Sequence, residues 1–253
     1  MKKYSLMLLL SFLFFGCGEG GESSSSLDST SGISGSKTKF KISGDYIYTV
    51  NGDTISILDI ADASNPIPIT RNTIPHHIDT IAMYENYLYV GSSNQIYVYD
   101  KTDPTNLEDP IMFNDAQSCN PIAVANGLAY VLFNIDSTCG FSSRSKLDVI
   151  DIRDISSPKL IKTEPMWSPT AVGIDNNKLF VCEGTKGIKV FDINQTENNN
   201  TISVELNRVD AKAEEINCYD LIADQNNLII SDSENILQFD YSSFPMTEMG
   251  TIK

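Results

Sequence analysis

The chain has 253 residues, of which 41% are hydrophobic and 20% charged, and its 33 acidic and 18 basic side chains give a formal charge of −15. This charge repels the phosphates of nucleic acids and of anionic lipids, which excludes a general nucleic-acid-binding role. The ordinary hydrophobic fraction and the length favour one mid-sized globular domain over a disordered chain or a multi-pass membrane protein.

The first 16 residues are predicted to be a signal peptide. Lys2 and Lys3 precede an apolar run of about 12 residues, which is too short to cross a bilayer of roughly 30 Å as a helix. The stretch Leu13-Phe14-Phe15-Gly16-Cys17 resembles the processing site of bacterial lipoproteins. The resemblance implies that Cys17 carries the lipid anchor, and an ordinary cleaved signal with a free cysteine is the alternative.

Residues 17–37 are predicted to form a flexible linker behind the anchor. From Gly18 to Ser36 only Leu27 and Ile33 are sizeable apolar side chains, too few to bury a core. Gly18 stands where an Asp would resemble an inner-membrane retention signal, so an outer-membrane lipoprotein is expected. Removal of residues 1–16 leaves 16 basic and 33 acidic side chains, a net charge of −17.

Residues 38–253 contain five copies of one pattern. Its clearest part is an alternating strand that ends in an aspartate, and successive aspartates are 41, 51, 41 and 48 residues apart. The five strands are Ile55–Asp59, Ile96–Asp100, Leu147–Asp151, Ile188–Asp192 and Ile236–Asp240. Two strands joined by a tight Asn- or Gly-containing turn precede each of them, and a polar turn and a fourth strand follow.

Four antiparallel strands in a period of 40–50 residues are typical of a propeller blade. The sequence therefore predicts an all-β fold, a five-bladed β-propeller over residues 38–253. Because the fifth copy ends in a short fourth strand at Ile252-Lys253, closure of the ring would depend on packing between blade faces alone.

The five units resemble LVIVD repeats, a family of bacterial propeller-forming repeats. In that family the third strand ends in an apolar-Val/Ile-Asp pattern, and a turn of the Asp-x-x-Asp-Pro kind follows. The resemblance implies a propeller and assigns no chemistry, since one fold hosts many functions.

The loops that enter the first strands are expected to surround one mouth of the central channel. We call them the loop ring: residues 75–79, 116–120, 165–168 and 215–220. They contain both histidines and the single tryptophan, which makes the ring the candidate binding site. The candidate ligand-binding residues are His76, His77, Trp167, Tyr219 and Asp220, and packing between blades is the alternative role for the histidines and the tryptophan.

Metal and cofactor chemistry find little support. Adjacent side chains point apart in an extended chain, which argues against zinc at His76, His77 and Asp79. The repeated aspartates suit calcium, but they suit hydrogen bonds to the following turn better. No nucleotide-binding or metalloprotease motif occurs, so we expect no cofactor, no metal and no assignable catalytic residue.

Four cysteines remain after Cys17, an even number that suits disulfides in an oxidising compartment. Cys119 precedes the first strand of the third repeat and Cys139 follows its second strand, and we predict that they form a disulfide. The remaining pair is Cys182 and Cys218, with Cys182 as a buried free thiol the alternative.

Three functions are compatible with these features. The first is a non-enzymatic envelope lipoprotein whose propeller binds a protein, a peptide or a glycan. The second is a carboxylate-based hydrolase acting on carbohydrate, although nothing in the sequence selects a catalytic pair. The third is a structural component of the cell envelope.

Overall fold

A computed structural model of the chain describes residues 33–34, 39–92, 95–107, 109–113, 121–134, 144–209 and 216–253. All of them belong to one compact unit, Ser31–Lys253. The described residues form strands and turns and contain no helix. Among them, accordingly, there is no helix that is long and apolar enough to cross a membrane. The predicted signal peptide and Cys17 lie outside the described residues.

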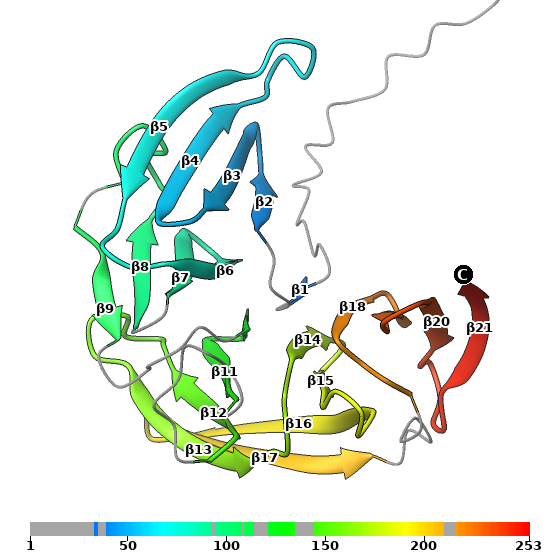
Figure 1. Ribbon diagram of the computed structural model, residues 1–253. Helices are drawn as coiled ribbons and strands as arrows, with labels where there is room; N and C mark the ends of the chain where they lie inside the picture. The colour runs from blue at the N-terminus through cyan, green and yellow to red at the C-terminus, as the bar shows by residue number, and fades with distance from the viewer. Residues whose placement is uncertain are drawn as a thin grey trace, which may run out of the picture. The chain divides into compact units, whose positions relative to one another are not determined.

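Four consecutive strands form each of five antiparallel sheets, which we call blades 1 to 5 in chain order (Figure 1). The predicted all-β, five-bladed propeller is therefore confirmed. Blade 1 consists of β2 (Phe40–Ser43), β3 (Tyr46–Asn51), β4 (Thr54–Asp59) and β5 (Ile67–Thr73), and blade 2 of β6 (Ile78–Tyr84), β7 (Tyr87–Ser92), β8 (Ile96–Asp100) and β9 (Ile111–Phe113). Blade 3 consists of β10 (Ile122–Ala125), β11 (Leu128–Phe133), β12 (Lys146–Asp151) and β13 (Lys159–Pro165). Blade 4 consists of β14 (Ala171–Asp175), β15 (Lys178–Cys182), β16 (Ile188–Asn198) and β17 (Thr201–Val209), and blade 5 of β18 (Asp220–Asp224), β19 (Asn227–Ser231), β20 (Ile236–Asp240) and β21 (Thr247–Ile252).

The turns between the first two strands of each blade have the left-handed backbone that the sequence predicted. Every one of them contains a residue with positive φ: Gly44, Glu85, Asn126 with Gly127, Asn176 with Asn177, and Gln225 with Asn226. Asparagine and glycine tolerate this region at little cost, and two such residues in succession match the twist of a two-residue hairpin.

Each pair of neighbouring blades shares one hydrophobic core. The four buried clusters join blades 1 and 2, 2 and 3, 3 and 4, and 4 and 5. Blades 2 to 4 are therefore buried on both faces, and their central strands are apolar at nearly every position, as in β11 (Leu128–Phe133), where all six residues are buried.

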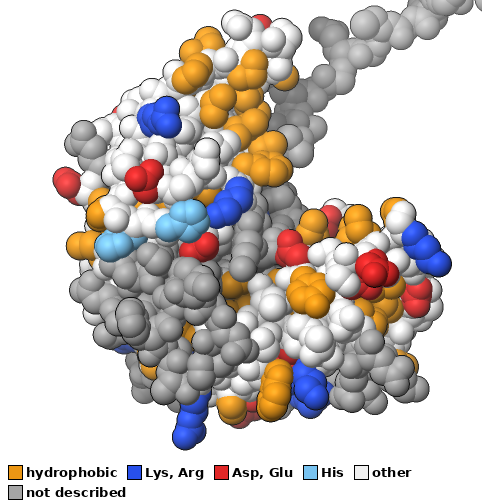
Figure 2. All heavy atoms as spheres, in the orientation of Figure 1, with side chains coloured by type: hydrophobic (Ala, Val, Ile, Leu, Met, Phe, Trp, Pro, Cys, Tyr) orange, Lys and Arg blue, Asp and Glu red, His pale blue; other side chains and the backbone are white. Residues whose placement is uncertain are grey.

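Blades 1 and 5 differ because only one of their two faces is buried. Phe40 and Ile42 of β2 are exposed, and so are Ile222 of β18, Ile229 of β19 and Ile236 of β20. Figure 2 shows hydrophobic side chains at the surface of both end blades. Among the described residues, no buried cluster joins blade 5 to blade 1.

A short strand, β1 (Ile33–Ser34), lies inside the predicted linker and pairs antiparallel with β14. Ile33 stands opposite Ile174 and Ser34 opposite Gly173, so this strand extends the sheet of blade 4 at its inner edge (Figure 1). The channel side of β14 is thus paired with a segment of the chain itself.

The repeated aspartates hold the turns that follow the third strands. Asp59 Oδ1 accepts the N–H of Ala61 at 2.8 Å, Asp100 that of Thr102 at 2.8 Å, Asp151 that of Arg153 at 3.1 Å, and Asp240 that of Ser242 at 2.7 Å. The structural role predicted for these four aspartates is confirmed.

Blade 4 departs from this rule, and the turn expected after its aspartate is a wrong prediction. β16 continues past Asp192 to Asn198, and the chain reverses only at Asn199 and Asn200, which both have positive φ. The alternating apolar residues of β17, Ile202 and Val204, are buried against the core of blades 3 and 4, which stabilises the longer hairpin.

Candidate functional site

The loop ring lies at one end of the blades, where the chain enters each first strand. Hydrogen bonds connect neighbouring blades at this end. The ammonium of Lys39 donates to the carbonyl of Ile78 at 2.7 Å, which links blades 1 and 2. The amide of Asn134 donates to Ser168 Oγ at 3.2 Å and to the Pro169 carbonyl at 3.1 Å, which links blades 3 and 4.

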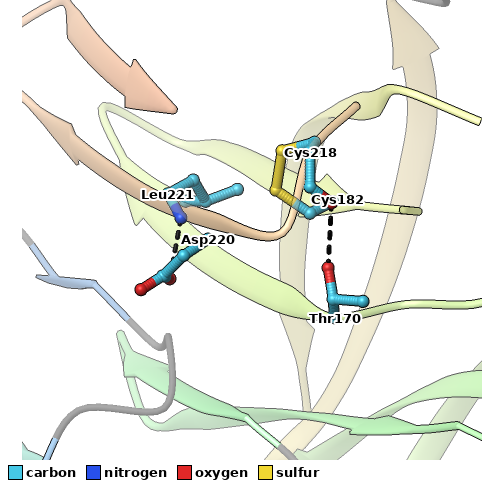
Figure 3. Close-up of a disulfide and its surroundings, with 5 residues drawn as sticks. All are labelled: Thr170, Cys182, Cys218, Asp220 and Leu221. Carbon is cyan, nitrogen blue, oxygen red and sulfur yellow. Dashed lines mark hydrogen bonds between the residues drawn. A yellow bond between two sulfur atoms is a disulfide. The ribbon is translucent and has the colours of Figure 1, made fainter. Parts of the chain in front are cut away.

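Blades 4 and 5 are joined covalently by a disulfide between Cys182 and Cys218, whose Cα atoms are 5.0 Å apart. The Thr170 hydroxyl donates to the Cys218 carbonyl at 3.1 Å, and Figure 3 shows both links side by side. This pairing is the one that the sequence left open, and both cysteines are fully buried. The predicted partners Cys119 and Cys139 lie outside the described residues.

Trp167 is the most prominent side chain of the described loop ring. It is 66% exposed, yet its backbone N–H donates to Glu183 Oε1 at 2.7 Å. The Lys186 ammonium lies 5.5 Å from the centre of the indole, within the range of a cation–π contact. A large aromatic side chain is therefore presented to solvent from a fixed backbone.

Glu183 is the residue that fixes this backbone. Its side chain is 3% exposed, and its two oxygens lie 3.0 and 3.1 Å from the ammonium of Lys189. A buried carboxylate is stable only when it is paired and hydrogen-bonded, and Glu183 has both kinds of partner. Sequence reasoning missed this residue, although a glutamate directly after the apolar strand Leu179–Cys182 is an unusual feature that could have indicated it.

Tyr219 and Asp220 follow the disulfide at the start of blade 5. Tyr219 is 44% exposed, and its N–H donates to the Ser231 carbonyl at 3.0 Å. Asp220 Oδ1 accepts the N–H of Leu221 at 2.8 Å (Figure 3). Because Thr170 contacts Cys218, the loops that hold Trp167 and Tyr219 are neighbours.

The two histidines occupy another part of the loop ring. They precede β6 in blade 2, which blade 3 separates from the Trp167 loop. His77 has a side chain that is largely exposed, and its Nε2 lies 3.7 Å from Asp79 Oδ1. Figure 2 shows both histidines, in pale blue, at the molecular surface.

Two features of the described residues bear on catalysis. They contain no group of three His, Cys, Asp or Glu side chains that could hold a metal ion. The aspartates whose pKa clearly moves, Asp62, Asp100, Asp103, Asp151, Asp232 and Asp240, all move downward because hydrogen bonds stabilise the carboxylate. A general acid needs the opposite shift, so these six carboxyls do not suit that one role.

Solved structures with the same fold support the architecture only. The chain is similar to the periplasmic gluconolactonase PpgL of Pseudomonas aeruginosa, with a TM-score of 0.54 and 9% identity over 83% of this chain and 67% of that one. It is equally similar to the β-propeller domain of Cps50 (Swd1) from Myceliophteria thermophila, with a TM-score of 0.54, 10% identity, and coverage of 83% and 70%.

Hsv2 of Kluyveromyces lactis matches with a TM-score of 0.50 and 16% identity over 81% of this chain. The chain spans less than two thirds of the Hsv2 structures that it matches, 62% in this case and 57% in another. No curated protein sequence matches the chain.

The family model that matches the chain is the LVIVD repeat. It covers residues 34–71, which include blade 1 except the last two residues of β5, and residues 77–109, which include the first three strands of blade 2. The chain is a five-bladed β-propeller that carries LVIVD repeats.

Proposed function

We propose that this protein is a non-enzymatic lipoprotein of the bacterial outer membrane whose propeller binds a protein, a peptide or a glycan through the loop ring. The observation that carries the proposal is Trp167, an exposed indole on a backbone fixed by a buried carboxylate. Binding energy at protein surfaces concentrates in a few residues, and tryptophan is enriched among them.

The neighbouring links make this part of the ring rigid before any ligand arrives. The disulfide, the Thr170 hydrogen bond and the Asn134 hydrogen bonds connect three successive blades beneath Trp167 and Tyr219. Preorganisation of this kind lowers the entropy that binding costs. The exposed tyrosine next to the disulfide adds a second aromatic surface to the same site.

Trp167 also makes the proposal directly testable, because it is the only tryptophan in the chain. Its fluorescence should shift to shorter wavelength when a ligand covers the indole. We suggest titrating the full chain with chitohexaose, cellohexaose and an extended Tyr- and Lys-containing peptide. A shift with one of these three probes supports the site and tells a glycan from a peptide.

Calorimetry with the probe that causes the shift then measures how much Trp167 contributes to the affinity. Trp167→Ala should weaken binding by roughly 30-fold, since a hot-spot truncation costs about 2 kcal/mol or more. Leu160→Ala, which removes an exposed apolar side chain from β13, is the matched control and should leave affinity unchanged. Equal affinities of the two variants would assign binding to another surface.

The lipid anchor needs its own experiment. In the bacterium, the full chain should incorporate radioactive palmitate and sediment with the outer membrane. A Cys17→Ala variant should lose the label and be recovered in soluble fractions. A labelled Cys17→Ala protein would show that the lipid is attached elsewhere or that the anchor prediction is wrong.

A further inference from the structure

A pocket of about 420 Å³ lies at the end of the blades opposite the loop ring. It is lined by the β6–β7 turn of blade 2, by the β10–β11 turn and the β12–β13 loop of blade 3, and by the extended β16–β17 hairpin of blade 4. The turns between first and second strands lie at one end of an antiparallel blade, while the loops into the first strands lie at the other. This pocket is therefore separate from the site around Trp167.

Tyrosine side chains form one wall of the pocket. Tyr84 and Tyr87 stand opposite each other in the hairpin register, and Tyr89, two residues further along β7, lies on the same face. The Tyr84 hydroxyl accepts the N–H of Gly127 at 3.0 Å, which fixes this ring against blade 3. Burial raises the pKa of Tyr84 and of Tyr89, so both rings remain neutral phenols.

Carboxylates dominate the charge around these rings. Glu85 and Glu197 line the pocket together with a single cation, Arg153. The guanidinium of Arg153 is already engaged: it donates to both oxygens of Asp151 at 3.0 and 2.8 Å, and to Glu197 Oε1 at 2.6 Å. Asp151 adds a third carboxylate and Lys159, which lies close enough to lower the pKa of Asp151, adds a second cation, so the local charge is −1.

The wall opposite the tyrosines exists only because blade 4 breaks the repeat. The part of β16 beyond Asp192 supplies Glu197, which binds Arg153, and Gln195, whose amide donates to the Asn126 carbonyl at 3.4 Å. Gly127 makes room for the same arginine, since a Cβ at this position would lie 2.7 Å from Arg153 Cγ. Three blades thus contribute to one preformed pocket.

Aromatic faces beside carboxylates are complementary to an organic cation. The negative face of a tyrosine ring attracts an ammonium group, and a nearby carboxylate supplies the counter-charge. We propose that the pocket formed by Tyr84, Tyr87, Glu85 and Glu197 binds a primary alkylammonium group, either as a small amine or as a lysine side chain of a peptide. This site is independent of the proposed function at Trp167.

Calorimetry on the full chain tests the proposal with defined probes. Nα-acetyl-lysine amide should bind, and Nα-acetyl-norleucine amide, which has a similar shape without the charge, should not. Glu85→Gln and Tyr87→Leu should each weaken lysine amide binding by roughly two- to tenfold. Glu205→Gln, an exposed carboxylate outside the pocket, and Tyr46→Leu, the equivalent tyrosine of blade 1, should leave it unchanged.

Further measurements distinguish a polypeptide ligand from a small amine and define the results that would overturn the cation site. Tighter binding of a pentalysine peptide than of lysine amide indicates a polypeptide ligand, and equal binding indicates a small amine. Equal binding of the norleucine probe overturns the cation site, and so does binding of maltose with none of lysine amide. If Tyr87→Leu does not fold, Glu85→Gln still decides, because that side chain is exposed.

Discussion

At the scale of single residues, the aspartates after the third strands act as turn-forming acceptors. The hydroxyl and the backbone N–H of Thr102 hold the pKa of Asp100 below its ordinary value of 3.8, and Thr105 acts on Asp103 in the same way. A carboxyl whose pKa is lower in the folded state stabilises the fold above the unfolded pKa. This stabilisation is lost as the pH falls through the pKa that the carboxyl has in the folded state.

We therefore expect the urea midpoint of unfolding to fall between about pH 4 and pH 2. In an Asp100→Asn/Asp103→Asn variant, each amide oxygen can still accept the same N–H groups, but the side chain is not protonated as the pH falls. Its midpoint should decline less steeply than that of the natural protein, whereas Glu205→Gln should follow the natural protein. Parallel declines in all three proteins would contradict the assignment.

At the scale of elements, most strands could be predicted from the period-two pattern and the turn residues. The pattern failed after Asp192 because the aspartate, which ends the third strand in the other repeats, was treated as a stop in every repeat. The alternation of Ile202, Val204 and Leu206 behind Asn199-Asn200 was the readable signal of a longer hairpin. The pocket that this hairpin closes could not be predicted, because it depends on contacts among three blades.

The disulfide between blades 4 and 5 is the other element-scale feature with a measurable effect. Cys182 and Cys218 are 36 residues apart, and closing such a loop stabilises the fold by about 4 kcal/mol in the chain-entropy model. Cys182→Ala and the double alanine variant should lose similar amounts of unfolding free energy in chemical denaturation. A loss below about 1 kcal/mol in both would mean that the bond contributes little to stability.

At the scale of the whole propeller, the exposed faces of blades 1 and 5 show whether these two blades pack against each other. Phe40 and Ile81 occupy equivalent positions in the first strands of blades 1 and 2, three residues before the last residue of each strand. Phe40 is 59% exposed, whereas Ile81 is fully buried. Phe40→Ala should therefore cost less than about 1 kcal/mol of unfolding free energy, against about 2–5 kcal/mol for Ile81→Ala. A Phe40→Ala cost of about 3 kcal/mol or more would indicate that this face is buried in solution.

For the loop ring, the repeats predict which loops are neighbours but not which charged side chains are buried beneath them. Aligning the repeats placed Trp167 and Tyr219 in neighbouring loops, and the hydrogen bond from Thr170, just after the first loop, to Cys218, just before Tyr219, agrees with that. The buried pair of Glu183 and Lys189 was missed, because the alignment says which end of a blade a residue occupies but not which charges pack beneath it.

The assembly order of the chain follows from the way each blade is built. All four strands of every blade are consecutive, so a blade is complete as soon as its last strand emerges from a ribosome or an export channel. When a new blade emerges, the face of the preceding blade against which it packs has already formed. Contacts between successive blades span short chain separations, which favours rapid folding. Only β1 must wait for a distant segment, since its partner β14 is made more than a hundred residues later. The N-terminal segment therefore cannot take its place until three blades and the first strand of the fourth have emerged.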